Sequence, residues 1–403
     1  MDSWDGLFAY FDFNKKNMKI FLTGSAGFLG TRVLPLLAKH HQVTCFKGDL
    51  LKPQTIPDFD CIVHLAARVP KTKQEDTKDL YEQNIRMCKN LPPTRIIFAS
   101  TVEAFTPNTW YGKSKLASEK LFPNTTILRF SVMYGPGDHI DRAIPNFVTA
   151  AIRGDNITIT GASNKRDYLH VDDAARAILL AVKYQPRGIF FIGTGHAVTI
   201  RDAARAIAPE AKIKEKSAPK HDLLFDTKKA AKALKFQAKY RFPDRISELI
   251  PRPIVFDLDG TILDVSKKYA AIPKEQFKKL IETPKYLALD TIYPEMEDIL
   301  QYLYGKYPLY LVTMRKNRKN LLSQLEALGL NQFFPDTRVI NPKDKIKAVK
   351  KIKPALVIGD TQLDIQAAQA AGAKSILVPY RKNLHAIIEK IYAQSVDHHP
   401  RVQ

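Results

Sequence analysis

The chain has 403 residues, of which 62 are Lys or Arg and 41 are Asp or Glu, so its formal net charge is +21. Hydrophobic residues make up 45% and charged residues 26%, a balance that argues against a disordered, collagen-like or coiled-coil chain. At about 150 residues per domain, this length predicts two or three domains. The positive charge favours a polyanionic ligand, and composition alone does not choose between a nucleic acid, an anionic membrane and phosphorylated small molecules.

The cysteines and the apolar runs bear on the compartment. Cys45, Cys61 and Cys88 form no Cys-x-x-Cys pair, which argues against a disulfide framework and favours a reducing compartment. No apolar run approaches the roughly 20 residues of a membrane span. Residues 1–17 lack the basic start and apolar core of a signal peptide. We therefore expect a cytoplasmic protein without a membrane span, and leave open whether residues 1–17 belong to the native protein.

Strand-like apolar runs alternate with segments of helical periodicity along the chain. The first series of predicted strands covers Lys19–Thr23, Val43–Phe46, Cys61–His64, Arg95–Ser100, Thr126–Phe130 and Gly188–Ile192. Helices are predicted between these strands, for example at Leu29–Ala38 and Lys113–Leu121. A second series of strands follows the proline-punctuated stretch Pro243–Pro253 and covers Ile254–Phe256, Leu309–Thr313, Ala355–Ile358 and Ser375–Val378.

This alternation is typical of parallel sheets covered by helices on both faces. We therefore predict an α/β protein with two doubly wound, Rossmann-like parallel-sheet domains in tandem. We place an N-terminal extension at residues 1–17, the first domain at residues 18–250 and the second at residues 251–403. Lys and Arg outnumber Asp and Glu in both domains, so no single tail carries the charge.

A glycine-rich turn follows the first predicted strand directly. Residues Lys19–Leu34 read KIFLTGSAGFLGTRVL, which places Gly24, Gly27 and Gly30 between a strand and a helix. Glycines in such a turn let the backbone approach a pyrophosphate, and the amino end of the helix offers it free N–H groups and a positive dipole. The turn therefore predicts a dinucleotide site.

Three more motifs follow in order. The tetrapeptide HLAA begins at His64, Thr101 ends a predicted strand, and Tyr111 and Lys115 form a Y-x-x-x-K motif one helical turn apart. With the G-x-x-G-x-x-G spacing, this order resembles the short-chain dehydrogenase/reductase superfamily over residues 18–250. The resemblance is strongest to the extended branch, which contains nucleotide-sugar epimerases, dehydratases and reductases.

The resemblance implies a nucleotide-sugar substrate, NAD or NADP as cofactor, and Thr101, Tyr111 and Lys115 as catalytic residues. Arg166 would face the substrate diphosphate, for which a bidentate donor is suited. The family also allows a homodimer. The cofactor residues that the resemblance implies are Gly24, Gly27, Phe28, Leu29, Gly30, Lys47, Asp49, Leu50, Leu65, Ala66, Ala67, Tyr111 and Lys115.

A tyrosine base needs a large shift of its pKa. A phenol with a pKa of about 10 must lose its proton near pH 7, which requires roughly 4 kcal/mol from its surroundings. The ammonium of Lys115 and a cationic nicotinamide would favour the phenolate. Tyr111 would then move a proton of a sugar hydroxyl while hydride passes to or from the nicotinamide, and Thr101 would hold the same hydroxyl.

The chain departs from the family pattern at several positions. Lys47 stands where NAD-specific members often carry an acid, which keeps NADP open. Thr101 and Tyr111 are only ten residues apart, which is shorter than usual, so a loop over the sugar is missing. Val102 replaces the acid that protonates the leaving hydroxyl in 4,6-dehydratases. Glu103 remains as a candidate base. The loss of the acid argues against dehydration and leaves epimerisation or ketone reduction ahead.

Carboxylates mark the ends of the second series of strands. Asp257 and Asp259 follow one strand, while Asp360 and Asp364 follow another and lie one helical turn apart. The carboxyl ends of parallel strands meet at one edge of a sheet, so we expect these acids to converge there. Oxygen ligands of this kind favour Mg²⁺.

The order D-x-D-G-T, Thr313, lysine and G-D-x-x-x-D resembles the haloacid dehalogenase superfamily, mostly phosphatases, over residues 253–380. It implies Asp257 as nucleophile and Asp259 as acid/base. It also implies that Thr313 and a lysine hold the phosphoryl oxygens, and we prefer Lys345 to Lys343. The implied metal residues are Asp257, Asp259 and Asp360.

Two further segments belong to this second domain. The short stretch Val265–Thr291, which we call the cap segment, lies where the family inserts a cap, and its length predicts a fairly open site. The basic run Arg315–Lys319 is interpreted as a solvated loop, with a grip of Arg315 on a second anionic group of the substrate as the alternative.

These observations favour a bifunctional enzyme: a nucleotide-sugar epimerase or reductase fused to a Mg²⁺-dependent phosphatase that acts on a phosphomonoester. Such a fusion would suit the synthesis of a surface-polysaccharide sugar. One alternative is a regulatory protein whose first half senses NAD(P), although a sensor does not need the Tyr111 base. A nucleic-acid binder is the weakest alternative, because the basic residues are scattered and no recognition motif accompanies them.

Overall fold

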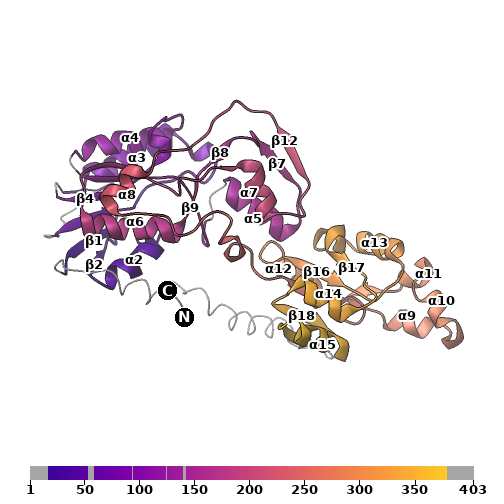
Figure 1. The fold of residues 1–403 in the computed structure, drawn as a ribbon. Helices are drawn as coiled ribbons and strands as arrows, with labels where there is room; N and C mark the ends of the chain where they lie inside the picture. Colours follow the sequence, from indigo (N-terminus) through magenta and orange to yellow (C-terminus); the bar gives the residue numbers. More distant parts are fainter. Residues whose placement is uncertain (1–16, 53–58, 93, 124, 139–141, 379–403) are drawn as a thin grey trace. The chain divides into compact units, whose positions relative to one another are not determined.

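The computed structural model describes residues 17–52, 59–92, 94–123, 125–138 and 142–378, and the predicted extension at residues 1–17 lies outside them except for Asn17. The chain divides into two compact units (Figure 1). The first unit holds the described residues up to Phe147 together with Thr158–Ile207 and Lys214–Leu249. The second holds Val148–Ile157, Ala208–Ile213 and the described residues from Ile250 onward.

The described residues of the first unit form a six-stranded parallel sheet in the order β10-β5-β4-β3-β1-β2. The first predicted series of strands is therefore confirmed, with ends that shift by no more than one residue. The strands are β1 (Lys19–Thr23), β2 (Gln42–Cys45), β3 (Cys61–His64), β4 (Ile96–Thr101), β5 (Thr126–Phe130) and β10 (Gly188–Ile192).

Helices cover both faces of this sheet (Figure 1). Successive side chains of a strand point to opposite faces, and β1 shows this: Leu22 packs with α2 and α6 in one apolar cluster, while Phe21 packs with α3 residues in another. The covering helices are α2 (Gly30–Ala38), α3 (Lys78–Lys89), α4 (Trp110–Leu121), α6 (Val171–Tyr184) and α8 (Lys228–Leu234).

Smaller elements complete the first half of the chain. Three two-stranded sheets pair β6 (Val132–Tyr134) with β9 (Tyr168–His170), β7 (Ile157–Thr160) with β12 (Ile213–Lys216), and β8 (Lys165–Arg166) with β11 (Val198–Thr199). The other helices are α5 (Ala143–Arg153), α7 (Ile200–Ile207), η1 (Lys73–Glu75), η2 (Val102–Ala104) and η3 (Ile246–Glu248).

The second unit is built on a five-stranded parallel sheet in the order β17-β16-β13-β18-β19. β13 is central and buried, which places the residues that follow it at the middle of the sheet edge. The strands are β13 (Ile254–Phe256), β16 (Leu309–Val312), β17 (Val339–Ile340), β18 (Leu356–Gly359) and β19 (Lys374–Leu377).

Apolar clusters fill both faces of this sheet. The helices around it are α12 (Pro294–Leu303), α13 (Arg318–Ala327), α14 (Lys345–Ile352), α15 (Gln362–Ala370), η5 (Leu330–Gln332) and η6 (Asp336–Arg338). The two parallel sheets confirm the predicted α/β class with two domains of this type in tandem.

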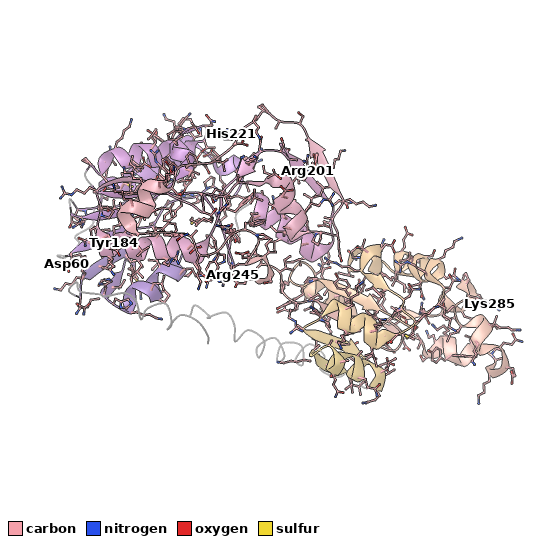
Figure 2. The ribbon with its side chains drawn as sticks, in the orientation of Figure 1. Asp60, Tyr184, Arg201, His221, Arg245 and Lys285 are labelled. Carbon is pink, nitrogen blue, oxygen red and sulfur yellow. The ribbon has the colours of Figure 1, made fainter. Side chains whose placement is uncertain are left out.

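The cap segment runs from the end of β14 (Leu263–Asp264) to the first residue of β15 (Thr291–Ile292), and these two strands pair antiparallel. Its helices are short: α9 (Ser266–Ala271), η4 (Lys274–Gln276), α10 (Phe277–Leu280) and α11 (Pro284–Leu287). Lys285 of α11 is exposed (Figure 2). Within the described part of the chain, no helix combines the length and apolar character that a bilayer crossing requires.

Candidate active sites

The glycine turn after β1 adopts a backbone that only glycine fits well. Gly24 has a φ of +72°, and a Cβ there would lie 2.7 Å from the backbone N of Ala66. A Cβ on Gly30 would lie 2.0 Å from the carbonyl O of Gly24, so the first turn of α2 packs directly on the loop. The turn therefore leaves its backbone open to a ligand while it holds α2 against the end of β1.

A cavity of about 440 Å³ opens beside this turn and brings most of the predicted first site together. Residues of the glycine turn, the HLAA motif, the end of β4 and the start of α4 all line it. The predicted residues in its wall are Gly24, Gly27, Phe28, Leu29, Gly30, Leu65, Ala66, Ala67, Thr101, Tyr111, Lys115 and Arg166.

Three predicted cofactor residues are not part of that wall. Lys47 and Asp49 are exposed, and the Asp49 carboxylate accepts a hydrogen bond from Leu51 N at 2.9 Å. Leu50 is buried in the apolar cluster that contains Phe21. Their contact with a cofactor remains a prediction.

The start of α4 places Tyr111 at the cavity. The Thr109 side chain caps the helix by accepting from Gly112 N at 2.9 Å. The Asp76 carboxylate accepts from Tyr111 N at 2.8 Å and from Trp110 N at 3.1 Å. Acidic and hydroxyl acceptors at this end satisfy N–H groups that have no partner inside the helix. The first turn of α4, and with it the backbone of Tyr111, is thereby fixed.

The electrostatics of Tyr111 differ from the expectation for a base. Burial raises the pKa of Tyr111 to about 12; the positive charge of Arg142 opposes this rise, and the carboxylate of Glu103 adds to it. In the cofactor-free protein Tyr111 is therefore a neutral phenol. Lys115 is also buried, with its Nζ 4.2 Å from the centre of the Phe98 ring, and burial lowers its pKa to about 8.

A buried ion pair lies one helical turn beyond Lys115. Glu119 accepts from Arg129 through both oxygens, Nε to Oε1 at 2.9 Å and Nη2 to Oε2 at 2.6 Å. Ser100 Oγ donates to Glu119 Oε1 at 2.5 Å. The negative charge of Glu119 raises the pKa of Lys115 against the stronger effect of burial. The pair thus supports the charge of a lysine in the cavity wall.

Sequence reasoning missed two residues of this first site, Arg142 and Asp76. Arg142 lines the cavity and acts on Tyr111 electrostatically, as does Glu103, and Asp76 binds the backbone of Tyr111. Asp76 precedes Tyr111 by 35 residues, and no motif links the two positions. Arg166 is held by carbonyl oxygens, since its Nη1 donates to Lys165 O at 2.9 Å and also to His221 O.

The second site lies at the carboxyl edge of the β13 sheet. Lys345 Nζ donates to Asp257 Oδ1 and forms an ion pair with Asp364 Oδ1 at 2.6 Å. All three side chains are almost completely buried. Lys343, the alternative to Lys345 in the sequence, is exposed. Burial raises the pKa of Asp257 to about 7, against the opposing charge of Lys345.

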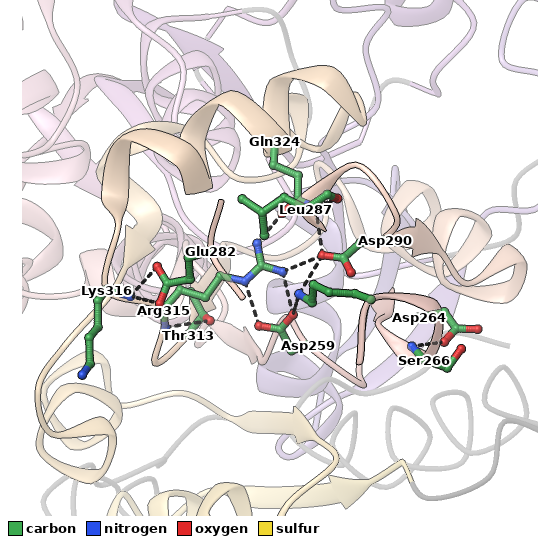
Figure 3. Close-up of polar contacts among 11 residues, drawn as sticks. Asp259, Asp264, Ser266, Glu282, Leu287, Asp290, Thr313, Arg315, Lys316 and Gln324 are labelled. Atoms are coloured by element: carbon green, nitrogen blue, oxygen red, sulfur yellow. Dashed lines mark hydrogen bonds and ion pairs between the residues drawn. The ribbon is translucent and has the colours of Figure 1, made fainter. Parts of the chain in front are cut away.

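Asp259 is held by two cations (Figure 3). Arg315 donates through Nε to Oδ2 at 2.8 Å and through Nη2 to Oδ1 at 2.6 Å, and Lys268 Nζ lies 3.2 Å from Oδ1. Burial works to raise the pKa of Asp259, but the hydrogen bonds and charges of Arg315 and Lys268 outweigh it and hold this pKa below its usual value. Asp259 is therefore a carboxylate in the free protein.

The two cations share a second acid, Asp290. Its Oδ2 accepts from Lys268 at 2.9 Å, from Gln324 Nε2 at 3.0 Å and from Arg315 Nη2 at 3.1 Å (Figure 3). Its side chain has no solvent exposure. The interpretation of residues 315–319 as a solvated loop is therefore wrong for Arg315, which is 7% exposed, although Lys316 and Lys319 are exposed.

No sequence motif predicts a role for Lys268, Asp290 or Gln324. They lie in the cap segment and in α13, outside the four motifs of the second domain. The predicted Thr313 lies at the end of β16 and is 2% exposed, and its Oγ1 accepts from Arg315 N at 3.4 Å. The structure therefore brings Thr313 next to Arg315.

The remaining acid, Asp360, is a candidate ligand for a metal cation. A Cβ on Gly260 would lie 2.2 Å from Asp360 Oδ2, so this carboxylate rests on the D-x-D-G-T turn. Burial raises the pKa of Asp360, and the charge of Asp364 adds to the effect. In the described part of the chain no three His, Cys, Asp or Glu side chains form a complete metal site. Mg²⁺ commonly uses one or two protein carboxylates and keeps several waters, and Asp257 and Asp360 fit that requirement.

Comparison with known proteins gives a family match in each half of the chain. The model of the NAD dependent epimerase/dehydratase family matches residues 20–193, and that of the haloacid dehalogenase-like hydrolase family matches residues 275–378. The first match contains the predicted catalytic residues of the first site. The second match begins after Asp257 and Asp259, so this pair lies outside it.

Curated relatives resemble about half of the chain. The dTDP-D-glucose 4,6-dehydratase of Dictyostelium discoideum is 23% identical over 266 residues, which cover 47% of this chain and 61% of the relative. The CDP-abequose synthase of Salmonella muenchen is 22% identical over 238 residues, which cover 48% of this chain and 81% of the relative. The chain thus spans less than two thirds of the first relative's length.

Solved structures show the same fold. RMD from Pseudomonas aeruginosa, complexed with NADPH, superposes with a TM-score of 0.52 at 18% identity and covers 58% of this chain and 96% of its own. The UDP-glucose 4-epimerase of Thermotoga maritima gives a TM-score of 0.50 at 22% identity over 58% and 97%. The two family matches identify a domain of the NAD dependent epimerase/dehydratase family at residues 20–193, followed by a haloacid dehalogenase-like hydrolase domain at residues 275–378.

Proposed function

We propose that the chain is a bifunctional enzyme. Its first unit is an NAD(P)-dependent nucleotide-sugar epimerase or reductase, and its second is a Mg²⁺-dependent phosphatase that works through an aspartyl-phosphate. The observation that carries the first assignment is that the glycine turn, Thr101, Tyr111 and Lys115 line the same cavity. The sugar-nucleotide names of the relatives support the substrate class. Two such activities in one chain suit the synthesis of a surface-polysaccharide sugar.

In the first unit, Tyr111 takes the proton of a sugar hydroxyl when hydride leaves the sugar, or gives a proton to the sugar ketone when hydride arrives, and Thr101 orients the same oxygen. The cofactor, when bound on the glycine turn, supplies the hydride acceptor or donor and, in its oxidised form, a positive charge. Because Tyr111 is a neutral phenol in the free protein, its activation depends on that charge together with Lys115 and Arg142. Arg166, fixed by carbonyl oxygens, would bind the substrate diphosphate.

Epimerisation or reduction is favoured over dehydration by the residue after Thr101. Val102 lines the cavity but is only 3% exposed, and its side chain carries no proton to give to a leaving hydroxyl. Glu103 is tied to Thr109, whose hydroxyl donates to its Oε2 at 3.1 Å. Position 102 therefore provides no acid for the elimination step of a dehydratase.

The test for the first unit is a screen of nucleotide sugars with NAD and NADP, followed by NMR. Tyr111→Phe keeps the ring and removes the acidic hydroxyl, so turnover should fall by about 100-fold or more. Tyr184→Phe, outside the cavity wall, is the matched control and should retain full turnover. Unchanged turnover in Tyr111→Phe would contradict the proposed base.

In the second unit, a carboxylate oxygen of Asp257 attacks the phosphorus, and the leaving oxygen departs with the electron pair of the broken bond. That oxygen takes its proton from solvent and not from Asp259, because Arg315 and Lys268 hold Asp259 as a carboxylate. Water then attacks the aspartyl-phosphate, Asp259 takes its proton, and Asp257 leaves as a carboxylate with release of inorganic phosphate. Lys345 and Thr313 stabilise the phosphoryl oxygens. The observation that carries this assignment is the buried contact of Lys345 with Asp257 at the sheet edge.

The carboxylates of Asp257 and Asp360 would hold Mg²⁺, whose charge would offset repulsion between Asp257 and the phosphoryl group. Both side-chain oxygens of Asp259 already accept from Arg315 and Lys268, so the carboxylate of Asp259 is engaged by these cations and Asp257 and Asp360 are the main candidates. The role of Asp259 as a metal residue stays a prediction.

The test for the second unit is phosphate release from small phosphomonoesters with and without Mg²⁺. Asp257→Asn should abolish release, and Asp298→Asn, a change at an exposed position of α12, should leave it unchanged. Phosphate release that survives Asp257→Asn would refute the phosphatase assignment without affecting the first unit.

A further inference from the structure

The buried network around Asp259 joins two parts of the second unit (Figure 3). Lys268 and Asp290 come from the cap segment, whereas Arg315 follows β16 and Gln324 lies on α13. Lys268 and Asp290 are at most 1% exposed through their side chains, and Arg315 is 5% exposed through its side chain. Two cations and two acids balance here, which is the condition under which buried charges persist.

The guanidinium of Arg315 fixes the plane of the Asp259 carboxylate. Its Nε and Nη2 each donate to a different oxygen of Asp259, at 2.8 Å and 2.6 Å. A two-pronged contact of this kind defines orientation as well as position, which a lysine ammonium does not. Lys268 adds a third donor from the side of the cap segment.

Arg315 is itself fixed by groups that do not touch Asp257. Its Nη1 donates to Gln324 Oε1, and its Nη2 also donates to Asp290 Oδ2 at 3.1 Å. Gln324 is held in turn, because its Nε2 donates to Leu287 O at 2.7 Å. The position of the guanidinium is therefore fixed by the protein before substrate binds.

We propose that Arg315, seated by Gln324 and Asp290, is the positioning residue that holds Asp259 where it takes the proton of the hydrolytic water. This inference rests on the proposed phosphatase function and deepens it. The cap segment then supplies part of the catalytic geometry through Lys268 and Asp290, and is not only a cover.

The chemistry separates two steps that a substrate with a good leaving group can distinguish. With p-nitrophenyl phosphate, the nitrophenolate departs with its electron pair and needs no proton from Asp259. In the second step the water oxygen bonds to phosphorus, the water proton goes to Asp259, and the bond between phosphorus and Asp257 breaks. Loss of the position of Asp259 should therefore slow the second step and spare the first.

The experiment uses the full chain with Mg²⁺ and p-nitrophenyl phosphate in a stopped-flow instrument. In Arg315→Lys, which keeps the charge but loses the fork, kcat should fall about 30-fold, while kcat/KM should stay within about 3-fold of wild type. Because the phosphoenzyme should accumulate, a burst approaching one nitrophenolate per protein should precede the steady state. Gln324→Leu, an uncharged change that unseats Arg315, should give the same pattern more weakly.

Arg318→Lys is the matched control. Arg318 lies three residues on, and its guanidinium binds Val339 O at 2.7 Å and Asn341 Oδ1 at 3.0 Å, away from Asp259. It should show no burst and an unchanged kcat.

Three outcomes would overturn the proposal. Equal loss of kcat and kcat/KM without a burst in both Arg315→Lys and Gln324→Leu would mean that the network only supports the fold. A raised KM at unchanged kcat would make Arg315 a substrate ligand. Wild-type burst behaviour in both variants would also refute it. Failure of the phosphatase assignment is separate, since it appears as phosphate release that survives Asp257→Asn.

Discussion

The carboxylate of Asp76 accepts a hydrogen bond from the backbone N–H of Tyr111, with 2.8 Å between N and Oδ1. Asp76 follows η1, and Tyr111 stands in the first turn of α4, so a residue far away in the sequence anchors the helix that carries the proposed base. The negative charge also lies at the positive end of the helix dipole. Asp76 thus stabilises the end of the short connection between Thr101 and Tyr111, although it is not part of that connection.

Replacing Asp76 should loosen the start of α4. Asp76→Ala removes both acceptors, and loss of such a cap costs about 1 kcal/mol. Turnover by the first unit should fall by about 10-fold, since small misplacement of a catalytic group is costly. Asp76→Asn keeps one oxygen acceptor and should retain most of the activity. Hydrogen exchange of the Trp110–Lys113 amides, measured beside turnover, checks the cause.

The matched control for this prediction is Asp79→Ala. Asp79 is exposed and accepts from Gln83 Nε2 at 2.6 Å, on the neighbouring helix α3. It should change neither exchange at the start of α4 nor turnover. Unchanged amide protection in Asp76→Ala would show that the hydrogen bonds to Trp110 and Tyr111 do not hold the helix.

Lys345→Met should destabilise the second unit strongly. The substitution leaves Asp257 and Asp364 buried without their shared cation, and breaking a buried pair costs about 3–5 kcal/mol. The pKa of Asp257 is already raised to about 7, so its protonation relieves part of this cost and places the expected loss near the lower bound. Hydrogen exchange of the β13 and β18 amides reports on this unit by itself. Lys347→Met, at an exposed position of the same helix, should have almost no effect.

Much of the fold could be predicted because its signals are local. The strands β1, β3, β5 and β13 have the predicted bounds, since each is a short buried apolar run that ends at a turn. Parallel order then brings the strand ends to one edge. The convergence of the glycine turn, Thr101 and Tyr111 on one cavity follows from that rule.

The supporting residues could not be predicted because their partners are distant in sequence. Asp76 acts on a backbone N–H, which leaves no residue pattern. Arg315 lies in a basic run whose composition indicates solvent, and only the fold reveals that Asp259 and Asp290 surround it. The electrostatic effect on Tyr111 also escaped prediction, because burial depends on packing that a motif does not encode.

A buried histidine should make the first unit sensitive to acid. His64 is 1% exposed, its Nδ1 lies 2.7 Å from Thr23 Oγ1, and burial together with the charge of Lys115 lowers its pKa to about 3. A lowered pKa means that the unfolded chain binds the proton first. The stabilisation is therefore complete above the unfolded pKa of about 6.5 and is lost as the pH falls towards 3.

The free energy of unfolding should thus decrease by up to about 1.4 kcal/mol per pH unit from His64 as the pH falls from 6 to 4. His64→Gln should flatten this slope, whatever its effect at pH 7. Trp110 fluorescence in a Trp4→Phe background follows urea unfolding of this unit. His196→Gln, at an exposed position, should keep the wild-type slope, and an equal slope in His64→Gln would contradict the prediction.

The charge of Lys115 should set an alkaline limit on the first activity. Burial lowers the pKa of Lys115 to about 8, while the charge of Glu119 opposes that effect. The ammonium form predominates below this pH, so kcat/KM, which reports on the free enzyme, should fall as the pH rises through about 8. Glu119→Gln removes one opposing charge and leaves Arg129 unneutralised nearby, and both changes lower the pKa of Lys115 further.

The alkaline limb of kcat/KM should therefore move down by about one pH unit in Glu119→Gln. The position of the limb is the readout, because a loss of stability lowers the whole curve without moving it along the pH axis. Glu82→Gln, at an exposed glutamate of α3 that pairs with Lys78 at 3.6 Å, should leave the limb in place. A limb that stays fixed or moves to higher pH in Glu119→Gln would show that the alkaline limit belongs to a group other than Lys115.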